Sequence, residues 1–430
     1  MTRPFEIRTA LNEGIDRQIL HQLRGRFLAV NQGRLARAMA GLTPCQQTVL
    51  SLLALLFHVN HRLLPGYVSD CTPAGVSGYA PDAPTLEKAQ ALAPDFTYTS
   101  APTAPLSIHG LYLMGSLGTL AQTDKSDMDV WICHAPDLDE GALAALHQKC
   151  HQLELWAAIQ GWEAHFFLID AQRYAQGEAA LKWSEDDSAA VQHSLLLDEF
   201  YRTAIWLAGR TPLWWWVPVC EEARYVEFAS ALQAKCFVGA DEVIDLGHLA
   251  HIAPSEFLGA GLRQLFKGID SPYKSVLKLL LIEVYASEHP QVNCLSLGFK
   301  RAVYSNQLDL DELDPYVVVY RRIEDYLRAC GDEQRLELVR RSLYLKVNPK
   351  LTRHAAQGGA QWQRQLLERL TTEWGWDAQQ LARLDNRSDW KIGPDSRERL
   401  ALSRELNGSY RFLSRLARDE PALRLSVSVD

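Results

Sequence analysis

The chain has 430 residues, of which 47% are hydrophobic, and its formal net charge at pH 7 is -8. This length predicts two or three domains, and the hydrophobic content is sufficient for large buried cores. The acidic balance argues against binding nucleic acid or an anionic membrane over a broad surface. A site for a polyanionic nucleotide would therefore need local basic residues or metal ions.

The 8 cysteines are scattered through the sequence, without a Cys-x-x-Cys pair or the grouping with histidine that is typical of zinc sites. The start, MTRPFEIRTA, does not have the basic and apolar pattern of a secretory signal. The longest apolar run, residues 49–59, is too short to span a bilayer and predicts a buried helix. We therefore expect a cytoplasmic protein that does not insert into a membrane.

Residues 10–63 have the apolar spacing of helices, and Thr43 and Pro44 can begin one of them as N-cap and first helical residue. Residues 64–105 are rich in proline and glycine and predict an irregular connection. We expect residues 1–105 to form a helical leader that ends in this connection. The connection is either a passive linker or a functional loop, because long irregular loops inside compact domains are often functional.

Residues 113–134, LMGSLGTLAQTDKSDMDVWICH, are the most informative stretch of the chain. An apolar strand runs into Gly115 and Ser116, and after a polar loop the alternation of a strand resumes at Asp127. Asp127 and Asp129 are two positions apart, so both carboxylates project from one face of a strand. Such a pair suits a hard cation such as Mg2+, whereas a solvated strand end is the alternative interpretation. The Gly-Ser pair favours the metal site, since glycine lets a phosphate approach the backbone and a serine hydroxyl can hold its oxygens.

This combination of Gly115-Ser116 with Asp127-x-Asp129 resembles the signature of the DNA polymerase β-like nucleotidyltransferase superfamily. The resemblance implies an α+β fold, with a mixed-sheet catalytic domain that we expect at residues 106–220. Enzymes of this superfamily attack the α-phosphate of a nucleoside triphosphate. The same activity is therefore expected of this domain.

A helix is predicted at residues 137–159, with Gly161 at its C-terminal cap, and a strand at residues 162–170. Nucleotidyltransferases usually take a third metal-binding acid from this strand. Glu163 at its start is the expected ligand, and Asp170 at its end is the alternative. For both, an ordinary surface carboxylate is the competing interpretation, because the spacing does not show which end of the strand reaches the two aspartates.

Residues 194–209 predict one amphipathic helix, in which Asp198 and Arg202 are four positions apart. This pair is either a surface ion pair that contributes about 0.2–0.5 kcal/mol, or Arg202 is a phosphate ligand. Residues 213–217 include three consecutive tryptophans and predict a buried strand, in which the indole rings serve packing.

A further helix is predicted to begin with Ser271 as N-cap and Pro272 as its first residue. Lys274 then lies in the first turn, where its charge opposes the helix dipole, and Lys278 lies on the same face one turn later. A bound anion would offset this repulsion, whereas two solvated lysines are the alternative. The rest of the chain also has helical spacing, so we expect residues 221–430 to form a helical domain that closes over the triphosphate.

Several separated stretches together resemble one family, the bacterial class I adenylate cyclases of the enterobacterial type. They are YLMGSLGTLAQTDKSDMDVWICH, FFLID, LLLDEFYRTAIWLAGR, DSPYKSVLKLLLIEVY and LVRRSLYLKV. The resemblance spans nearly the whole chain. It implies the N-terminal catalytic portion of such an enzyme, with the regulatory C-terminal region, and the sugar-transport proteins that act through it, outside this chain.

The resemblance also implies that ATP is converted to 3′,5′-cyclic AMP and pyrophosphate. Asp127 and Asp129 would hold one Mg2+ ion and a second would bridge the phosphates, with Mn2+ possible in their place. The implied ligands of the triphosphate are Gly115, Ser116, Arg202, Lys274 and Lys278. Two alternatives remain open, namely transfer of AMP to an exogenous acceptor and an ATP-sensing module without catalysis.

Overall fold

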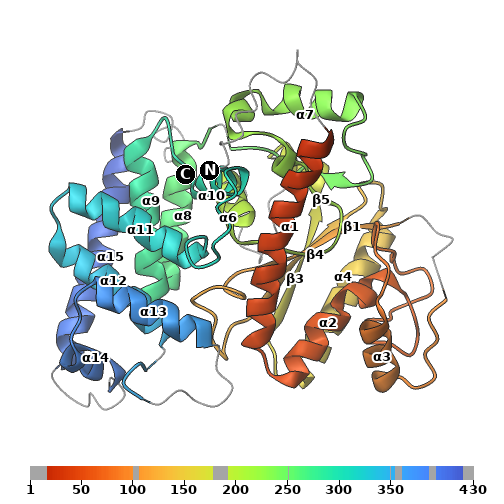
Figure 1. The fold of residues 1–430 in the computed structure, drawn as a ribbon, viewed down its shortest axis with the longest axis horizontal. Coiled ribbons are helices and arrows are strands. Elements are labelled where there is room, and N and C mark those ends of the chain that lie inside the picture. Colours follow the sequence, from red (N-terminus) through yellow and green to blue (C-terminus); the bar gives the residue numbers. More distant parts are fainter. Residues whose placement is uncertain are drawn as a thin grey trace, which may run out of the picture.

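The computed structural model describes residues 17–99, 106–177, 192–249, 251–348, 350–353, 361–386 and 394–419. One half of the molecule contains a small sheet with flanking helices, and the other half is helical (Figure 1). The fold class is therefore α+β, as expected. Among the described residues, none of the helices has both the length and the apolar character that a membrane span requires.

The sheet has four strands in the order β3-β2-β1-β4. β1 pairs antiparallel with both β2 and β4, while β2 and β3 are parallel, so the sheet is mixed. The parallel pair is connected by a helix, as parallel strands require. The elements are β1 (Ile108–Met114), β2 (Met128–His134), α4 (Glu140–Ile159), β3 (Ala164–Asp170) and β4 (Ile205–Gly209).

Both faces of the sheet are buried, and the alternation along the strands divides the core in two. Val130 and its alternate neighbours in β2 pack in one cluster with α2 (Pro44–His58) and α4. Trp131, on the opposite face, packs in a second cluster with α6 (His193–Thr203) and with the helical half. Asp129 belongs by alternation to this second face, so its carboxylate is directed toward the helical half.

The helical half is built around α9 (Pro272–Glu288), whose sides are buried by α8, α11, α12 and α15. This arrangement confirms that the C-terminal part of the chain is helical. Where the domain boundaries lie stays a prediction. The other helices of this half are α8 (Pro254–Lys267), α10 (Leu295–Tyr304), α11 (Pro315–Ala329), α12 (Glu333–Val347), α13 (Gln361–Glu373), α14 (Ala378–Asp385) and α15 (Pro394–Asp419). α7 (Tyr225–Ala234) lies above the sheet-containing half (Figure 1).

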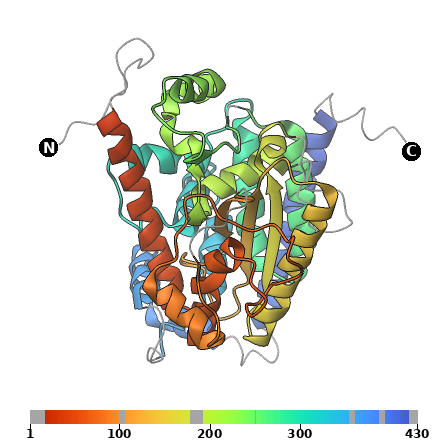
Figure 2. The ribbon, with the colours of Figure 1, turned by 90° about the vertical axis from the view of Figure 1, so that its right-hand side faces the viewer.

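The N-terminal helix α1 (Arg17–Ala40) lies across the junction of the two halves and contacts β4 and α10 (Figure 1). Figure 2 shows α1 and α4 on opposite sides of the strands. Thr43 caps α2 as predicted, in a reciprocal arrangement with Gln46. Residues 10–16, which were also expected to be helical, lie outside the described residues.

Three local predictions are wrong. The helix expected at residues 194–209 ends at Thr203, and Ile205–Gly209 forms β4, because pairing with the edge of β1 satisfies its backbone. Residues Leu213–Trp216 form a short 3-10 helix instead of a strand, although the tryptophans are buried as expected. The region predicted to be an irregular connection contains α3 (Ala83–Leu92), which Asp82 caps.

Candidate functional site

The turn between β1 and β2 brings Gly115 beside Asp129. Met114, the last residue of β1, pairs with Asp129 of β2, and Gly115 then turns the chain with φ +89°. A Cβ added to Gly115 would lie 3.4 Å from Asp129 Oδ2, and a positive φ also disfavours other residues here. The glycine therefore keeps the backbone close to the carboxylate and leaves the space around it open.

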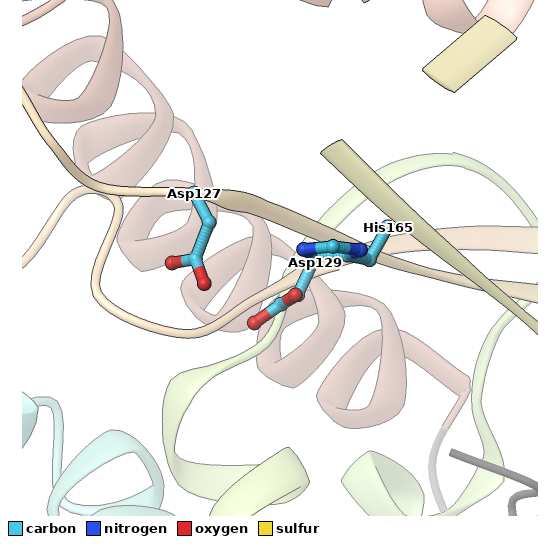
Figure 3. Close-up of side chains that lie close together, drawn as sticks. All are labelled: Asp127, Asp129 and His165. Carbon is cyan, nitrogen blue, oxygen red and sulfur yellow. The ribbon is translucent and has the colours of Figure 1, made fainter. Parts of the chain in front are cut away.

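Asp127, Asp129 and His165 form the one group of potential metal-binding side chains found among the described residues. Their ligand atoms all lie within 4.8 Å of one another (Figure 3). The register of the parallel pair β2 and β3 explains the grouping, since it sets His165 opposite Asp129. Two carboxylates and an imidazole are a fitting donor set for a divalent cation.

The two acids predicted as a third ligand are not among these three side chains. Glu163 precedes β3, is exposed, and has its Oε1 atom 3.2 Å from Nε2 of His165. Asp170 pairs with His134 at the other end of β3, where it caps the short helix that follows. At about 3.3 Å per residue, Asp170 is some 15 Å or more along the strand from His165. The structure therefore brings a histidine to the expected position of an acid, and Asp170 is too distant to take part.

Asp129 is electrostatically unfavourable as an anion in the absence of a cation. Burial and the neighbouring Asp127 raise the pKa of Asp129 to about 6, although His165 and nearby lysines lower it. Burial of a carboxylate beside another carboxylate disfavours its charge, and a bound divalent ion would relieve both effects. The electrostatics therefore agree with the donor set in favouring a cation.

A cavity with about 990 Å³ of empty space, including its open mouth, lies next to Asp129 between the end of β1 and helices α6, α8 and α9. Gly115 and Trp131 form part of one wall, and leucines of α6 form part of another. Five cationic side chains line this cavity, which is unusual in a chain of net negative charge. They are Arg202 on α6, Arg263 and Lys267 on α8, and Lys274 and Lys278 on α9.

Arg202 is part of a buried ion pair and not of the surface pair considered from the sequence. Its Nε atom lies 3.7 Å from Asp198 Oδ2, and both side chains are nearly inaccessible. Asp198 is held in turn by the hydroxyl of Tyr285 and the backbone N–H of Ser296, each at 2.9 Å. Arg202 therefore lies at the cavity wall beside a carboxylate that is itself held by hydrogen bonds.

Lys278 donates to both carboxylate oxygens of Glu199 at 3.0 Å. Burial would raise the pKa of Glu199, but Lys278 and Arg202 outweigh it and hold that pKa at about 2. Glu199 is therefore ionised at neutral pH and partly neutralises the basic wall of the cavity. The sequence analysis did not identify this residue.

The remaining cations repel one another. Burial, followed by Arg263 and the lysines of α9, lowers the pKa of Lys267 to about 8. The pKa of Lys274 is instead raised, by Tyr316 above all and also by the carboxylates of Glu199 and the two aspartates. Lys274 thus interacts favourably with the two aspartates and with Glu199. Such crowding favours a ligand with several negative charges.

Of the residues predicted to bind the substrate, Gly115, Arg202, Lys274 and Lys278 line one cavity with Asp129. Ser116 is placed differently, because its Oγ atom is buried and lies 2.9 Å from Ser126 Oγ within the turn. The sequence analysis missed Arg263 and Lys267, whose spacing of four positions just before Lys274 was the available signal.

The sequence was compared with known families and proteins. Residues 19–215 match the model of the adenylate cyclase NT domain, and residues 252–429 match that of the second domain of class I adenylate cyclase. The chain is 42% identical over 415 residues to the adenylate cyclase of Salmonella typhimurium, and 42% identical over 411 residues to that of Escherichia coli strain K12. It is 39% identical over 416 residues to the adenylate cyclase of Proteus mirabilis.

The alignments to the Salmonella and Escherichia proteins cover 95% of this chain and 48% of each relative, so the chain spans about half of their length. No solved structure matches. The two domain models follow one another in the order of the structure, the first over the sheet-containing half and the second over the helical half. Together with the identities, they show that the chain belongs to the class I adenylate cyclase family.

Proposed function

We propose that this chain contains the catalytic centre of an adenylate cyclase and converts ATP to 3′,5′-cyclic AMP and pyrophosphate. The observation that carries the proposal is the position of Asp127 and Asp129 beside a cavity lined by five cationic side chains. A site for a metal ion next to a site for several phosphates suits a nucleoside triphosphate. The relatives are named adenylate cyclases, which supports the same reaction.

Asp127 and Asp129 would hold two divalent cations, Mg2+ or Mn2+, which activate the ribose 3′-hydroxyl and neutralise phosphate charge when bound. The open backbone at Gly115 would let the α-phosphate approach Asp129. The hydroxyl of Ser116 would act indirectly, because its hydrogen bond with Ser126 holds the turn.

The cationic wall would bind the β- and γ-phosphates and stabilise the charge that develops on pyrophosphate as it leaves. Arg202, Lys274 and Lys278 are the predicted ligands, and we add Arg263 and Lys267 of α8. Charged groups that are positioned before the reaction stabilise a transition state more than mobile groups do, and Arg202 is paired with Asp198, which is itself held by hydrogen bonds. The nucleophile and the phosphate belong to one molecule, so the main task of the site is to orient the ribose.

Four of these cations come from α8 and α9, in the region that we expect to close over the triphosphate. This supports the proposed division into a leader, a catalytic domain at residues 106–220 and a helical domain at residues 221–430.

A substrate such as ATP suits a cytoplasmic enzyme. We further propose that the part of the relatives beyond the matched half carries regulation, including that by sugar-transport proteins.

The test is product analysis of the purified chain with ATP and Mg2+ or Mn2+, with nucleotides separated by chromatography. We expect cyclic AMP and pyrophosphate, and a loss of at least about a hundredfold in rate for Asp127→Asn. Asp124→Asn, in the exposed part of the same loop, is the matched control and should retain the rate. An AMP-acceptor adduct in place of cyclic AMP would identify a transferase, and binding of ATP without turnover would identify a sensor.

A further inference from the structure

We propose that His165 is the third protein ligand of the metal site, so that the site has two carboxylates and one imidazole in place of three acids. The proposal rests on the proposed function, because it concerns the metal ion of the same centre. It has a chemical consequence, which is that the nitrogen ligand shifts the preference of the site from Mg2+ toward Mn2+.

The strand register places His165 in the site. In the parallel pair of β2 and β3, Asp129 lies opposite His165. Neighbouring strands are about 4.8 Å apart, so side chains at paired positions on one face are in reach of the same ion. The ligand atoms of the three side chains lie within 4.8 Å of one another, and rotation of the side chains can bring them to the roughly 3–4 Å that separates ligands around a divalent ion.

Glu163 is suited to orient this imidazole. It is two positions before His165, and its Oε1 atom lies 3.2 Å from Nε2 of the ring. A histidine that binds a metal usually has its second ring nitrogen held by a carboxylate or a carbonyl, which fixes the ring and its tautomer. The side chain of Glu163 is 75% exposed, so it has little of the burial expected for a direct ligand. Glu163 is therefore a positioning residue in this proposal.

The donor set determines the preference for a metal. Mg2+ is a hard cation that favours an all-oxygen shell and holds its water tightly. Imidazole nitrogen is a better ligand for first-row transition ions, of which Mn2+ still accepts carboxylates readily. Exchanging a carboxylate for an imidazole should therefore raise the ratio of Mn2+ affinity to Mg2+ affinity.

The test measures metal binding without turnover, with and without a non-hydrolysable ATP analogue. Free Mn2+ is followed by electron paramagnetic resonance, Mg2+ is added as a competitor, and electron spin echo spectra report a coordinated nitrogen. We expect nitrogen modulation in the unchanged protein and its loss in His165→Gln, with Mn2+ affinity about 10- to 100-fold lower. Glu163→Gln should weaken Mn2+ binding less and keep the modulation. His165→Asp should lose the modulation and show a lower ratio of Mn2+ to Mg2+ affinity.

His151→Gln is the matched control, since His151 is an exposed histidine of α4 that pairs with Glu154. Its spectra and affinities should equal those of the unchanged protein, and circular dichroism should confirm that every variant is folded. Bound Mn2+ without nitrogen modulation, or the same modulation in His165→Gln, would refute His165 as a ligand while cyclic AMP formation still supports the proposed function. Absence of both Mn2+ binding and cyclic AMP would refute the two proposals together.

Discussion

At the scale of single residues, the site combines acids that repel each other with cations that repel each other. Asp127 raises the pKa of Asp129, and the lysines of α9 help to lower the pKa of Lys267. Lys274 links the two groups electrostatically, since both aspartates favour its charge while it helps to lower the pKa of Lys267. The free protein therefore stores electrostatic repulsion that a metal–triphosphate complex would relieve, since it brings positive charge to the acids and negative charge to the cations.

The first prediction concerns the stability of the metal-free protein. The pKa of Asp129 is about 6 in the fold, compared with the usual 3.8 of an aspartate side chain, so the fold disfavours its ionised form. Below the pKa of the unfolded chain, the carboxyl is protonated in both states and its ionisation costs no stability. The cost grows as the pH rises from that pKa to the pKa in the fold, and it is complete above the pKa in the fold. Asp129→Asn should therefore raise the free energy of unfolding by about 1–2 kcal/mol near neutral pH.

Urea denaturation in the presence of a chelator measures this effect. The gain should shrink as the pH falls below about 6 and disappear at about pH 3, where the carboxyl is largely protonated in both states. Asp124→Asn, at an exposed loop position, should give no gain at either pH. An equal gain from Asp129→Asn at both pH values would contradict the electrostatic explanation.

The second prediction concerns Lys274 as a ligand of the triphosphate. Lys274→Gln keeps much of the side-chain length but removes the charge, and should lower kcat/KM for ATP roughly 10- to 100-fold. Lys125→Gln is the control, because Lys125 is exposed in the loop between β1 and β2. Initial rates over a range of ATP concentrations measure both variants. Equal losses from the two substitutions would indicate a general effect of charge and not a contact.

At the scale of secondary structure, the site depends on strand pairing that local sequence does not specify. The turn from β1 to β2 was predicted because glycine, serine and both aspartates lie within one short stretch. His165 was missed because its position follows from the register of β3 against β2, across the whole of α4. β4 was taken for the end of a helix because the apolar run Ile205–Gly209 fits either structure, and its partner strand is far away in the sequence.

The same reasoning explains which cations were found. Lys274 and Lys278 were predicted because their conflict with the dipole of α9 is local. Arg263 and Lys267 on α8 show only a spacing of four positions, which does not by itself indicate a ligand, and they reach the cavity because α8 packs on α9. The sequence alone therefore identified the residues whose signal lies within one element. It missed those placed by contacts between elements.

The third prediction tests the close approach of β4 to β1. Gly209 has φ +92°, and an added Cβ would lie 2.4 Å from the carbonyl oxygen of His109 and 2.6 Å from Gly110 Cα. Because these are backbone atoms, Gly209→Ala must displace a strand, at a cost of about 2–4 kcal/mol in the free energy of unfolding.

Gly161→Ala is the control, because it measures the cost of a positive φ without a steric clash. Gly161 also has a positive φ, of +76°, but an added Cβ would meet nothing within 4 Å. Its substitution should cost only about 1–2 kcal/mol, the strain of a left-handed residue. Chemical denaturation of both variants measures the difference. Equal costs would mean that β1 and β4 are not as close as described.

At the scale of the whole molecule, Arg34 joins three parts of the chain. From α1 it donates to the carbonyl oxygens of Arg202, at the end of α6, and of Leu313, before α11, each at 2.9 Å. Burial lowers the pKa of Arg34 to about 10, partly offset by Asp314, so the guanidinium is still charged at neutral pH. Asp314 also accepts from the backbone N–H of Leu120 in the loop after β1. The leader helix thus contributes to the position of Arg202 at the cavity.

The fourth prediction follows from this junction. Arg34→Met should lower the free energy of unfolding by about 2–4 kcal/mol, because it leaves buried carbonyl groups without donors. It should also raise KM for ATP, since the end of α6 loses a support. Arg62→Met is the control, because the pair of Arg62 with Asp70 is exposed, with side chains 71% and 70% accessible. It should leave the free energy of unfolding nearly unchanged, and a similar loss in both variants would contradict the importance of the junction.

The reach of α1 also has a consequence for synthesis of the protein. The hydrogen bond from Arg34 to Leu313 spans 279 residues, so α1 must wait for these residues to be made before its contact with Leu313 can form. At about 5–20 residues per second, this wait is roughly 15 to 55 seconds. During that time the apolar side of α1 lacks its final partners and is open to chaperones or to wrong contacts. α1 is thus made well before its distant partners, and its contacts join segments from both halves of the molecule.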